Sequence, residues 1–209
     1  MKDYDLYLFD FDGTLVDTFK SLVEIFSRSF KAVGVEIKPE DCLLYSRQPL
    51  EDTYVSLNAP MDKVDIFASQ IQYWLDDEEI LKMAELFPDT YRCLKELHEA
   101  DKTIGIVTSN SEHHVIDTFR YLNIPVEWFS IIVGNDQVKE SKPSPQPVLS
   151  ALEQSRYLNK RDKVVYIGDG INDMISANRA GVDAILIDRV DAFSESDNYS
   201  KIQTLLDLI

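Results

Sequence analysis

One stretch near the N-terminus, residues 4–17 (YDLYLFDFDGTLVD), constrains the fold more than any other part of the chain. Its first half is apolar and aromatic, and it runs directly into two aspartates, Asp10 and Asp12. Carboxylates at the edge of a core must be hydrogen-bonded, paired with a cation or bound to a metal, because an unpaired buried charge is costly. Gly13 follows at once and lets the chain leave the strand direction. We therefore expect the rest of the chain to supply partners for these two carboxylates.

Beyond this stretch, apolar runs typical of strands alternate with segments of helical periodicity. We expect strands at residues 5–9, 103–107, 129–133, 164–167 and 184–187, and helices at 88–100, 115–122, 147–154, 173–180 and 201–208. Such alternation is typical of a mostly parallel sheet with helices on both faces. Residues 15–85 show helical periodicity and no strand of their own. The sequence thus predicts an α/β, Rossmann-like core formed by residues 1–14 and 86–209, with an all-helical cap domain inserted at residues 15–85.

The composition excludes some classes of partner. The chain has 209 residues, with 37 Asp and Glu against 21 Lys and Arg, and a formal net charge of −16. Nucleic acids and anionic membranes require a basic face, so neither is expected as a partner. Charges interrupt the apolar run at the N-terminus, so we expect neither a signal peptide nor a spanning helix, and a cytoplasmic location by default. Two cysteines are too few to indicate a disulfide framework.

Polar residues follow the predicted strands where ligands bind in open parallel sheets, at the carboxyl ends. In chain order these residues are Asp10 and Asp12, then Thr108, Ser109 and Asn110, then Lys142 in SKPSP, then Asp169 and Asp173 in GDGIND, and last Asp188. Each signal alone is weak, since a lone pair of acids is more often a solvated turn and a lone Thr-Ser more often a helix cap. Their joint order at successive strand ends makes coincidence improbable.

The chemistry that requires this set is phosphoryl transfer. A carboxylate can attack an anionic phosphate monoester only if charge is neutralised, and Mg²⁺ does this with oxygen ligands. Lys142 can supply positive charge to the phosphoryl oxygens, and Thr108 and the amides after it can donate hydrogen bonds to them. One aspartate would then form an aspartyl-phosphate, while a second, two residues on, acts as general acid and then as base.

Four segments resemble the four motifs of the haloacid dehalogenase-like (HAD) hydrolase superfamily. They are DFDGTLVD, the Thr108-Ser109 end of IGIVTSN, Lys142 in SKPSP, and GDGINDMISA. The resemblance covers nearly the whole chain, including the helical insert after the first motif. Among the members of the superfamily, the chain is most similar to the phosphoglycolate phosphatase-like group with a helical cap.

This resemblance implies a role for each motif. Asp10 would be the nucleophile and Asp12 the general acid and base. Mg²⁺ would be held by the Asp10 carboxylate, the Asp12 backbone carbonyl and Asp169, with Asp173 supporting the site through water or its neighbours. Thr108 and Lys142 would hold the phosphoryl group, with Ser109 and Asn110 beside them. The segment from Thr14 to Asp17 would be the flexible connection through which the cap opens and closes.

The chain departs from the group's pattern at two points. Its fourth motif reads GDGIND where a GDS form is common, and its cap has YSRQPLEDTY where relatives often show a glycine-containing specificity loop. Arg47 in that segment is the cap residue most suited to contact an anionic leaving group, and Lys20 is a weaker candidate. The sequence is at least as consistent with Arg47 being a solvated surface residue. We expect the substrate to be a small phosphorylated metabolite, such as a phosphoglycolate-, sugar- or nucleotide-phosphate-like compound, and the protein to be a monomer or homodimer.

Rival functions share parts of this pattern. A phosphomutase of the β-phosphoglucomutase type would use the same core, and the motifs do not separate it from a phosphatase. Dehalogenase activity is disfavoured because Asp12 provides acid–base chemistry that carbon–halogen displacement does not need, and no cap lysine suited to phosphonatase chemistry is evident. A phospho-acceptor receiver module lacks a DxDGT strand end and a large helical insert. An inactive scaffold is disfavoured because every catalytic position is present.

Overall fold

The structure, a computed structural model, describes residues 2–42, 50–189 and 199–209. The chain divides into two compact units. Unit 1 contains residues 1–17 and 86–209, and unit 2 contains residues 18–85. The chain therefore leaves unit 1 after Asp17 and returns to it at Leu86. That unit 2 acts as a cap domain stays a prediction at this point.

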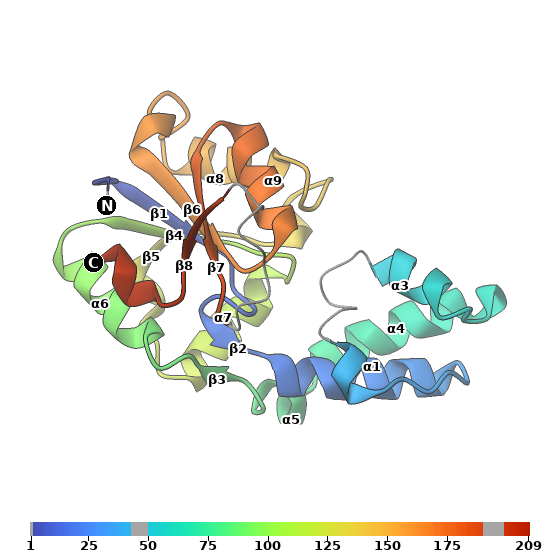
Figure 1. Cartoon of the computed structure of the whole chain (residues 1–209). Helices are drawn as coiled ribbons and strands as arrows, with labels where there is room; N and C mark the ends of the chain where they lie inside the picture. Colours follow the sequence, from blue (N-terminus) through green and yellow to red (C-terminus); the bar gives the residue numbers. More distant parts are fainter. Residues whose placement is uncertain (1, 43–49, 190–198) are drawn as a thin grey trace. The chain divides into compact units, whose positions relative to one another are not determined.

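Unit 1 is built on a six-stranded sheet with the strand order β5-β4-β1-β6-β7-β8, in which every neighbouring pair is parallel (Figure 1). The strands are β1 (Leu6–Phe9), β4 (Thr103–Val107), β5 (Phe129–Val133), β6 (Val164–Gly168), β7 (Asp183–Ile187) and β8 (Ser200–Ile202). The expected α/β fold with a parallel sheet is confirmed. The five apolar runs predicted as strands correspond to β1, β4, β5, β6 and β7 of this sheet.

The central strands are buried because both faces of the sheet are covered. All four residues of β1 are buried, as are all five residues of β6. Strands buried on both faces are expected to be continuously apolar, since there is no solvent side for a polar residue to occupy. This is why the LYLF run of β1 is a strand although it lacks alternation.

Helices cover both faces of the sheet of unit 1 (Figure 1). They are α6 (Thr90–Glu99), α7 (Glu112–Tyr121), α8 (Gln146–Gln154) and α9 (Ile171–Ala180). Helices α8 and α9 pack on one face, where Val148, Leu152 and Met174 join a core cluster with Leu8 and Tyr166. On the other face, the Phe119 ring of α7 stacks on Phe129 of β5 at 4.7 Å between ring centroids.

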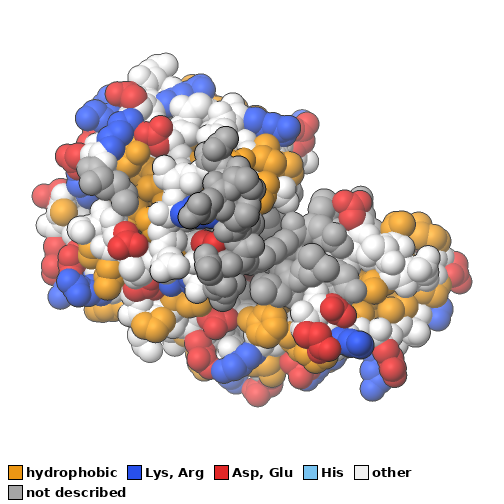
Figure 2. All heavy atoms as spheres, viewed as in Figure 1, with side chains coloured by type: hydrophobic (Ala, Val, Ile, Leu, Met, Phe, Trp, Pro, Cys, Tyr) orange, Lys and Arg blue, Asp and Glu red, His pale blue; other side chains and the backbone are white. Residues whose placement is uncertain are grey.

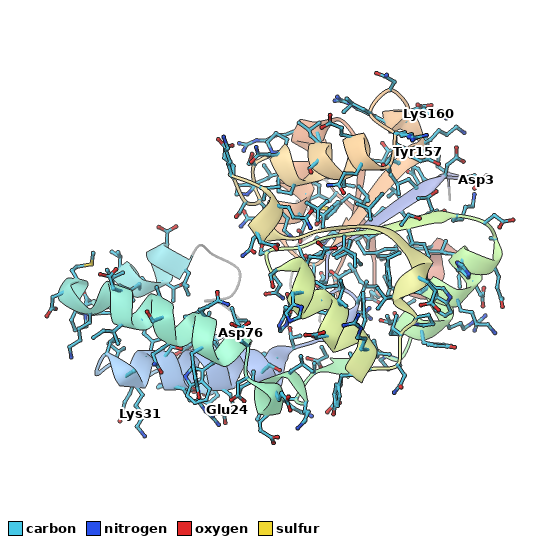
Figure 3. All side chains as sticks on the ribbon, turned by 180° about the vertical axis from the view of Figure 1, so that it is seen from behind. Asp3, Glu24, Lys31, Asp76, Tyr157 and Lys160 are labelled. Carbon is cyan, nitrogen blue, oxygen red and sulfur yellow. The ribbon has the colours of Figure 1, made fainter. Side chains whose placement is uncertain are left out.

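Unit 2 is helical and has its own core. Its helices are α1 (Phe19–Ala32), α3 (Leu50–Ser56), α4 (Val64–Leu75) and α5 (Glu78–Leu81), with 3₁₀ turns at Pro39–Asp41 and Met61–Lys63. Phe30, Tyr54 and Phe67 pack ring against ring at its centre. Glu24 and Lys31 lie on α1 (Figure 3), and Lys31 is exposed. Helix α1 is thus amphipathic in the way that its periodicity predicts.

Two details of the fold differ from the sequence-based expectation. Residues 201–208 are not one helix: Ser200–Ile202 form the edge strand β8, and only Leu205–Leu208 form a 3₁₀ helix. The cause is tertiary, because Lys201 and Ile202 lie opposite Leu186 and Ile187 of β7 and extend the sheet by one strand. In addition, Val16–Asp17 (β2) and Glu85–Leu86 (β3) form a two-stranded sheet at the ends of the segment expected to be all-helical.

Charged side chains of both signs are interspersed over the face of unit 1 shown in Figure 2. Within the described residues, no helix has the length and apolar character needed to cross a bilayer. Lys160 lies over the ring of Tyr157, 5.7 Å from its centroid, and both residues are labelled in Figure 3.

Candidate active site

The candidate site lies where the strand order of the sheet reverses. After β1 the chain continues to β4 and β5 on one side of it, and then returns to β6 on its other side. Open parallel sheets bind ligands at such a switch point, beyond the carboxyl ends of the strands. Asp10 follows β1 and Asp169 follows β6, which pairs with β1 from Leu6↔Val164 to Phe9↔Ile167. The two acids therefore emerge side by side at this edge.

The turn after β1 buries one aspartate and leaves the other partly exposed. The Asp10 amide donates to the Ile167 carbonyl at 2.8 Å, so the ladder continues one residue past the strand, and only 6% of Asp10 is exposed. Phe11 points into the core, where its ring meets Phe119. Gly13 then has a φ of +73°. A side chain at this position would also collide with the Asp169 carboxylate, so the turn requires glycine for two reasons.

Lys142 places its ammonium between two buried carboxylates. Its Nζ donates to Asp10 Oδ1 at 2.6 Å and to Asp173 Oδ1 at 2.7 Å. Only 7% of the Lys142 side chain is exposed, and the two acids are equally enclosed. Charge-assisted hydrogen bonds of this length are strong, and a buried lysine requires such partners. This ion-pair triad joins the first, third and fourth sequence motifs.

The loop that carries Lys142, between β5 and α8, is held by helix α9. Ser176 Oγ donates to the Ser144 carbonyl at 2.7 Å, and Arg179 donates to the Pro143 carbonyl at 3.2 Å. Both contacts tie the residues directly after Lys142 to the helix that also carries Asp173. The lysine and its second carboxylate are thus positioned by the same element.

The glycines of the GDGIND segment make room for Asp173. Asp173 Oδ2 accepts a hydrogen bond from the Gly170 amide at 3.0 Å, at the N-terminus of α9. A Cβ atom at Gly168 would lie 2.5 Å from Asp173 Cγ, so the carboxyl group occupies the space that a side chain there would fill. Helix N-termini stabilise carboxylates through their amides and dipole. Asp173 is therefore fixed from two directions, by an amide and by Lys142.

Three of the acids are close enough to share one cation. Single carboxylate oxygens of Asp10, Asp169 and Asp173 lie within 4.8 Å of one another. Hard oxygen ligands of this kind suit Mg²⁺. Since Asp173 already accepts hydrogen bonds from Lys142 and Gly170, its carboxyl group is better placed to support the cluster than to bind an ion directly.

The second motif contributes residues beside Asp12. The Asn110 Nδ2 group donates to Asp12 Oδ2 at 2.6 Å, across 98 positions of sequence. Thr108 is buried, and its Oγ1 accepts the Asn110 amide at 3.1 Å, which fixes the turn after β4. Ser109 is exposed. The structure therefore brings Asn110 to the carboxyl group of Asp12, a contact that the sequence pattern did not specify.

The electrostatics of the site favour a bound cation. Burial raises the pKa of the Asp10 carboxyl well above its usual value; Lys142 opposes this rise, and the nearby acids Asp173, Asp169 and Asp12 add to it. For Lys142, burial works to lower the pKa, but the Asp10 and Asp173 carboxylates outweigh it and hold the pKa well above its ordinary value, so the amine stays charged. One lysine among these acids leaves excess negative charge, which a divalent cation would neutralise.

Two site candidates of the sequence come from residues 15–85, the predicted cap. Arg47 falls outside the described residues. Lys20 forms an exposed salt bridge with Glu85 at 2.5 Å. One residue of the site has no motif at all: the hydroxyl group of Tyr166, in β6, lies 3.3 Å from Lys142 Nζ. The only signal for it in the sequence is a phenol within the otherwise apolar run VVYI.

Comparisons with known proteins agree with this geometry. A family model described as haloacid dehalogenase-like hydrolase matches residues 7–187. Pyrophosphatase PpaX of Bacillus velezensis is 30% identical over 175 residues, covering 83% of this chain and 78% of the relative. Phosphoglycolate phosphatase of Salmonella paratyphi A is 28% identical over 200 residues, covering 85% and 78%. A solved structure from Bacteroides fragilis, with the same family description, has a TM-score of 0.89 at 28% identity, covering 99% of this chain and 100% of that one.

Proposed function

Since this chain belongs to the haloacid dehalogenase-like hydrolase family, we propose that it is a phosphatase that hydrolyses a small phosphorylated metabolite through an aspartyl-phosphate on Asp10. The observation that carries the proposal is the buried triad in which Lys142 Nζ lies 2.6 Å from Asp10 and 2.7 Å from Asp173. A carboxylate can attack a phosphate dianion only where positive charge offsets the repulsion, and this lysine is placed to supply it.

In the first half of the reaction, an oxygen of the Asp10 carboxylate attacks phosphorus and the leaving oxygen departs. Lys142 offsets the charge of the nucleophile, and the Thr108 hydroxyl and the Ser109 amide donate to the phosphoryl oxygens. Asp12 donates a proton to the leaving group, with its carboxyl group held by Asn110 at 2.6 Å. A general acid is effective when it is held within hydrogen-bonding reach of the atom that it protonates.

In the second half, Asp12 accepts a proton from water as that water attacks the phosphorus of the aspartyl-phosphate. Phosphate leaves and Asp10 is regenerated. Mg²⁺, held by the carboxylates of Asp10 and Asp169 and by the Asp12 carbonyl, with Asp173 beside them, would supply positive charge to the phosphoryl oxygens. The cluster of acids within 4.8 Å of one another supports this ligand set.

The proposal is tested by phosphate release from p-nitrophenyl phosphate. We expect release that depends on Mg²⁺, stops on addition of a chelator, and is abolished by Asp10→Asn. Asp162→Asn is the matched control, because Asp162 is an exposed acid of unit 1 outside the site. Wild-type protein that releases no phosphate from this ester or from a panel of metabolite phosphates would contradict the phosphatase function.

The substrate is a separate question, for which the relatives offer two starting points. Curated relatives are named pyrophosphatase PpaX and phosphoglycolate phosphatase, so pyrophosphate and phosphoglycolate head the panel. Residues 15–85 serve in this proposal as the cap that selects among them. The rival activity, that of a phosphomutase, is distinguished by its product. A phosphomutase would convert a hexose phosphate into an isomer, whereas a phosphatase would release free phosphate.

A further inference from the structure

Tyr166 is a polar residue in an apolar position. It lies in the middle of β6, opposite Leu8 of β1, and its side chain is fully buried in the core cluster beneath α8 and α9. A phenylalanine would fill nearly the same volume without a hydroxyl group to satisfy. Burying a phenol costs free energy unless its hydroxyl group finds hydrogen-bond partners. The identity of those partners therefore indicates the role of Tyr166.

The hydroxyl group has three partners, and two of them belong to the site. It lies 2.9 Å from the Val107 carbonyl, 3.2 Å from Asp173 Oδ1 and 3.3 Å from Lys142 Nζ. A phenol has one proton to donate, and both the Val107 carbonyl and the Asp173 carboxylate can only accept it. The Val107 contact is shorter by 0.3 Å, at 2.9 Å against 3.2 Å, so we assign the proton to Val107. The phenol oxygen then presents its lone pairs toward the lysine.

The hydrogen-bond partners of the Lys142 ammonium can be assigned in the same way. It carries three protons, and three oxygens surround it: Asp10 Oδ1 at 2.6 Å, Asp173 Oδ1 at 2.7 Å and the Tyr166 hydroxyl at 3.3 Å. Two of the three acceptors are charged, and the third is neutral and rigidly held by the sheet. Without the hydroxyl, one proton of a buried ammonium would lose its acceptor, and only the two carboxylates would define the position of Nζ.

We propose that Tyr166 is a positioning residue whose hydroxyl, anchored on the Val107 carbonyl, holds the Lys142 ammonium between Asp10 and Asp173. It touches neither substrate nor reacting atoms and acts through Lys142. The claim that Tyr166 affects catalysis rests on the proposed phosphatase function. The claim that Tyr166 fixes the position of the Lys142 ammonium does not. The Lys142 charge remains when the hydroxyl is removed, so substrate binding should persist while the alignment of Asp10 and Lys142 suffers.

The kinetic test compares Tyr166→Phe with the wild type, using p-nitrophenyl phosphate and Mg²⁺. We expect kcat to fall about tenfold, in line with the loss of one hydrogen bond to a charged group, while KM changes less than twofold. Tyr157→Phe is the matched control: Tyr157 packs against the same core cluster but lies outside the site, and its variant should keep the wild-type kcat. A kcat for Tyr166→Phe within twofold of the wild type would overturn the catalytic part of the proposal.

A second measurement does not depend on activity. Buried, hydrogen-bonded lysine ammonium groups exchange protons slowly enough to give ¹H–¹⁵N signals, and Lys142→Met identifies the signal of Lys142 by its loss. We expect Tyr166→Phe to shift this signal and speed its exchange, and Tyr157→Phe to leave it unchanged. An unshifted signal in a folded Tyr166→Phe variant would refute the positioning role. If that variant does not fold, Tyr166→Met provides the same comparison with a flexible apolar side chain.

The two measurements separate failure of this inference from failure of the proposed function. An inactive wild type whose Lys142 signal still responds to Tyr166→Phe would contradict the phosphatase function and support the positioning role. An active wild type with neither a kinetic nor a spectroscopic response would keep the function and overturn the role of Tyr166.

Discussion

The largely buried ion pair between Arg189 and Asp89 gives the most specific stability prediction. Arg189, just after β7, donates to Asp89 Oδ2 at 3.0 Å and to the Thr14 carbonyl at 2.8 Å, and its guanidinium lies 3.9 Å from the centroid of the Phe87 ring. Asp89 Oδ2 also accepts the Leu205 amide at 2.7 Å. The pair thus ties the turn that follows Asp12 to the start of α6 and to the C-terminal segment.

The perturbation is Arg189→Met, which keeps much of the side-chain volume and removes the charge. Removing one partner of a buried ion pair costs about 3–5 kcal/mol, because the other charge is left uncompensated. We expect the lower end, about 3 kcal/mol, since Asp89 Oδ1 and Arg189 Nε find no hydrogen-bond partner among the described residues and the geometry is therefore not ideal. For a chain of this size that loss corresponds to a decrease in Tm of roughly 6–12 °C.

The loss of stability caused by Arg189→Met should depend on pH in a defined direction. Burial alone would raise the pKa of Asp89, but hydrogen bonds from Arg189, the Leu205 amide and Thr204 outweigh it and hold the pKa below its ordinary value. A carboxyl group with a lowered folded-state pKa stabilises the fold above its unfolded pKa, and this contribution is lost as the pH falls through the folded value. Arg189→Met removes part of this stabilising contribution of Asp89. The difference in unfolding free energy between the wild type and the variant should therefore be largest at pH 7 and should become smaller below about pH 4.

The assay is urea unfolding followed by tryptophan fluorescence. Trp74 lies in unit 2 and Trp128 in unit 1, so a Trp74→Phe background restricts the signal to the unit that contains the ion pair. Arg120→Met is the control, because the Arg120–Asp117 pair is exposed and should contribute less than about 1 kcal/mol. A loss below 1 kcal/mol at pH 7, or an equal loss at pH 7 and pH 3, would refute the reasoning.

Three further predictions concern the site. Asp12→Asn should let the aspartyl-phosphate form but slow its hydrolysis, so trapped phosphoenzyme should accumulate in acid-quenched samples; unchanged steady turnover would show that the role of Asp12 is misassigned. Asn110→Ala should lower kcat about tenfold, since the 2.6 Å contact with the Asp12 carboxyl is lost; kinetics like those of the wild type would disprove this role. Gly13→Ala should abolish Mg²⁺-dependent activity because the added Cβ collides with the Asp169 carboxylate. Gly34 also has a positive φ, of +87°, but no atom of the described residues lies within 4 Å of a Cβ added there, so Gly34→Ala should cost stability alone. Equal effects of the two substitutions on activity would count against the collision.

The strands and the order of the motifs were predictable because their signals are local. Each of the strands β1, β4, β5, β6 and β7 contains a short apolar run, and burial on both faces of a parallel sheet favours that pattern. The acids, the hydroxyl and the lysine follow those runs directly or by one loop. Right-handed crossovers then bring the carboxyl ends of the strands to one edge, so Asp10, Lys142, Asp169 and Asp173 were expected to meet.

The edge strand β8 was not predictable in the same way. Ser200–Ile202 is too short to show a period, and the apolar residues after it resemble a helix. Its conformation comes from the hydrogen bonds that β7 offers along its open edge, where Ile185 to Ile187 pair with it. Such pairing is a property of the neighbouring strand and leaves no mark on the paired segment itself.

The sequence by itself determined the class of the fold and indicated the residues that we propose carry the chemistry, starting from the strand that ends in Asp10 and Asp12. Local patterns suffice for both, because apolar runs must be buried and charges at their ends must find partners. Only the tertiary structure decided which partner each group has: Asn110 for Asp12, Tyr166 for Lys142, and Arg189 for Asp89. These contacts depend on side-chain direction at distances of about 3 Å between distant segments, which no spacing along the chain encodes.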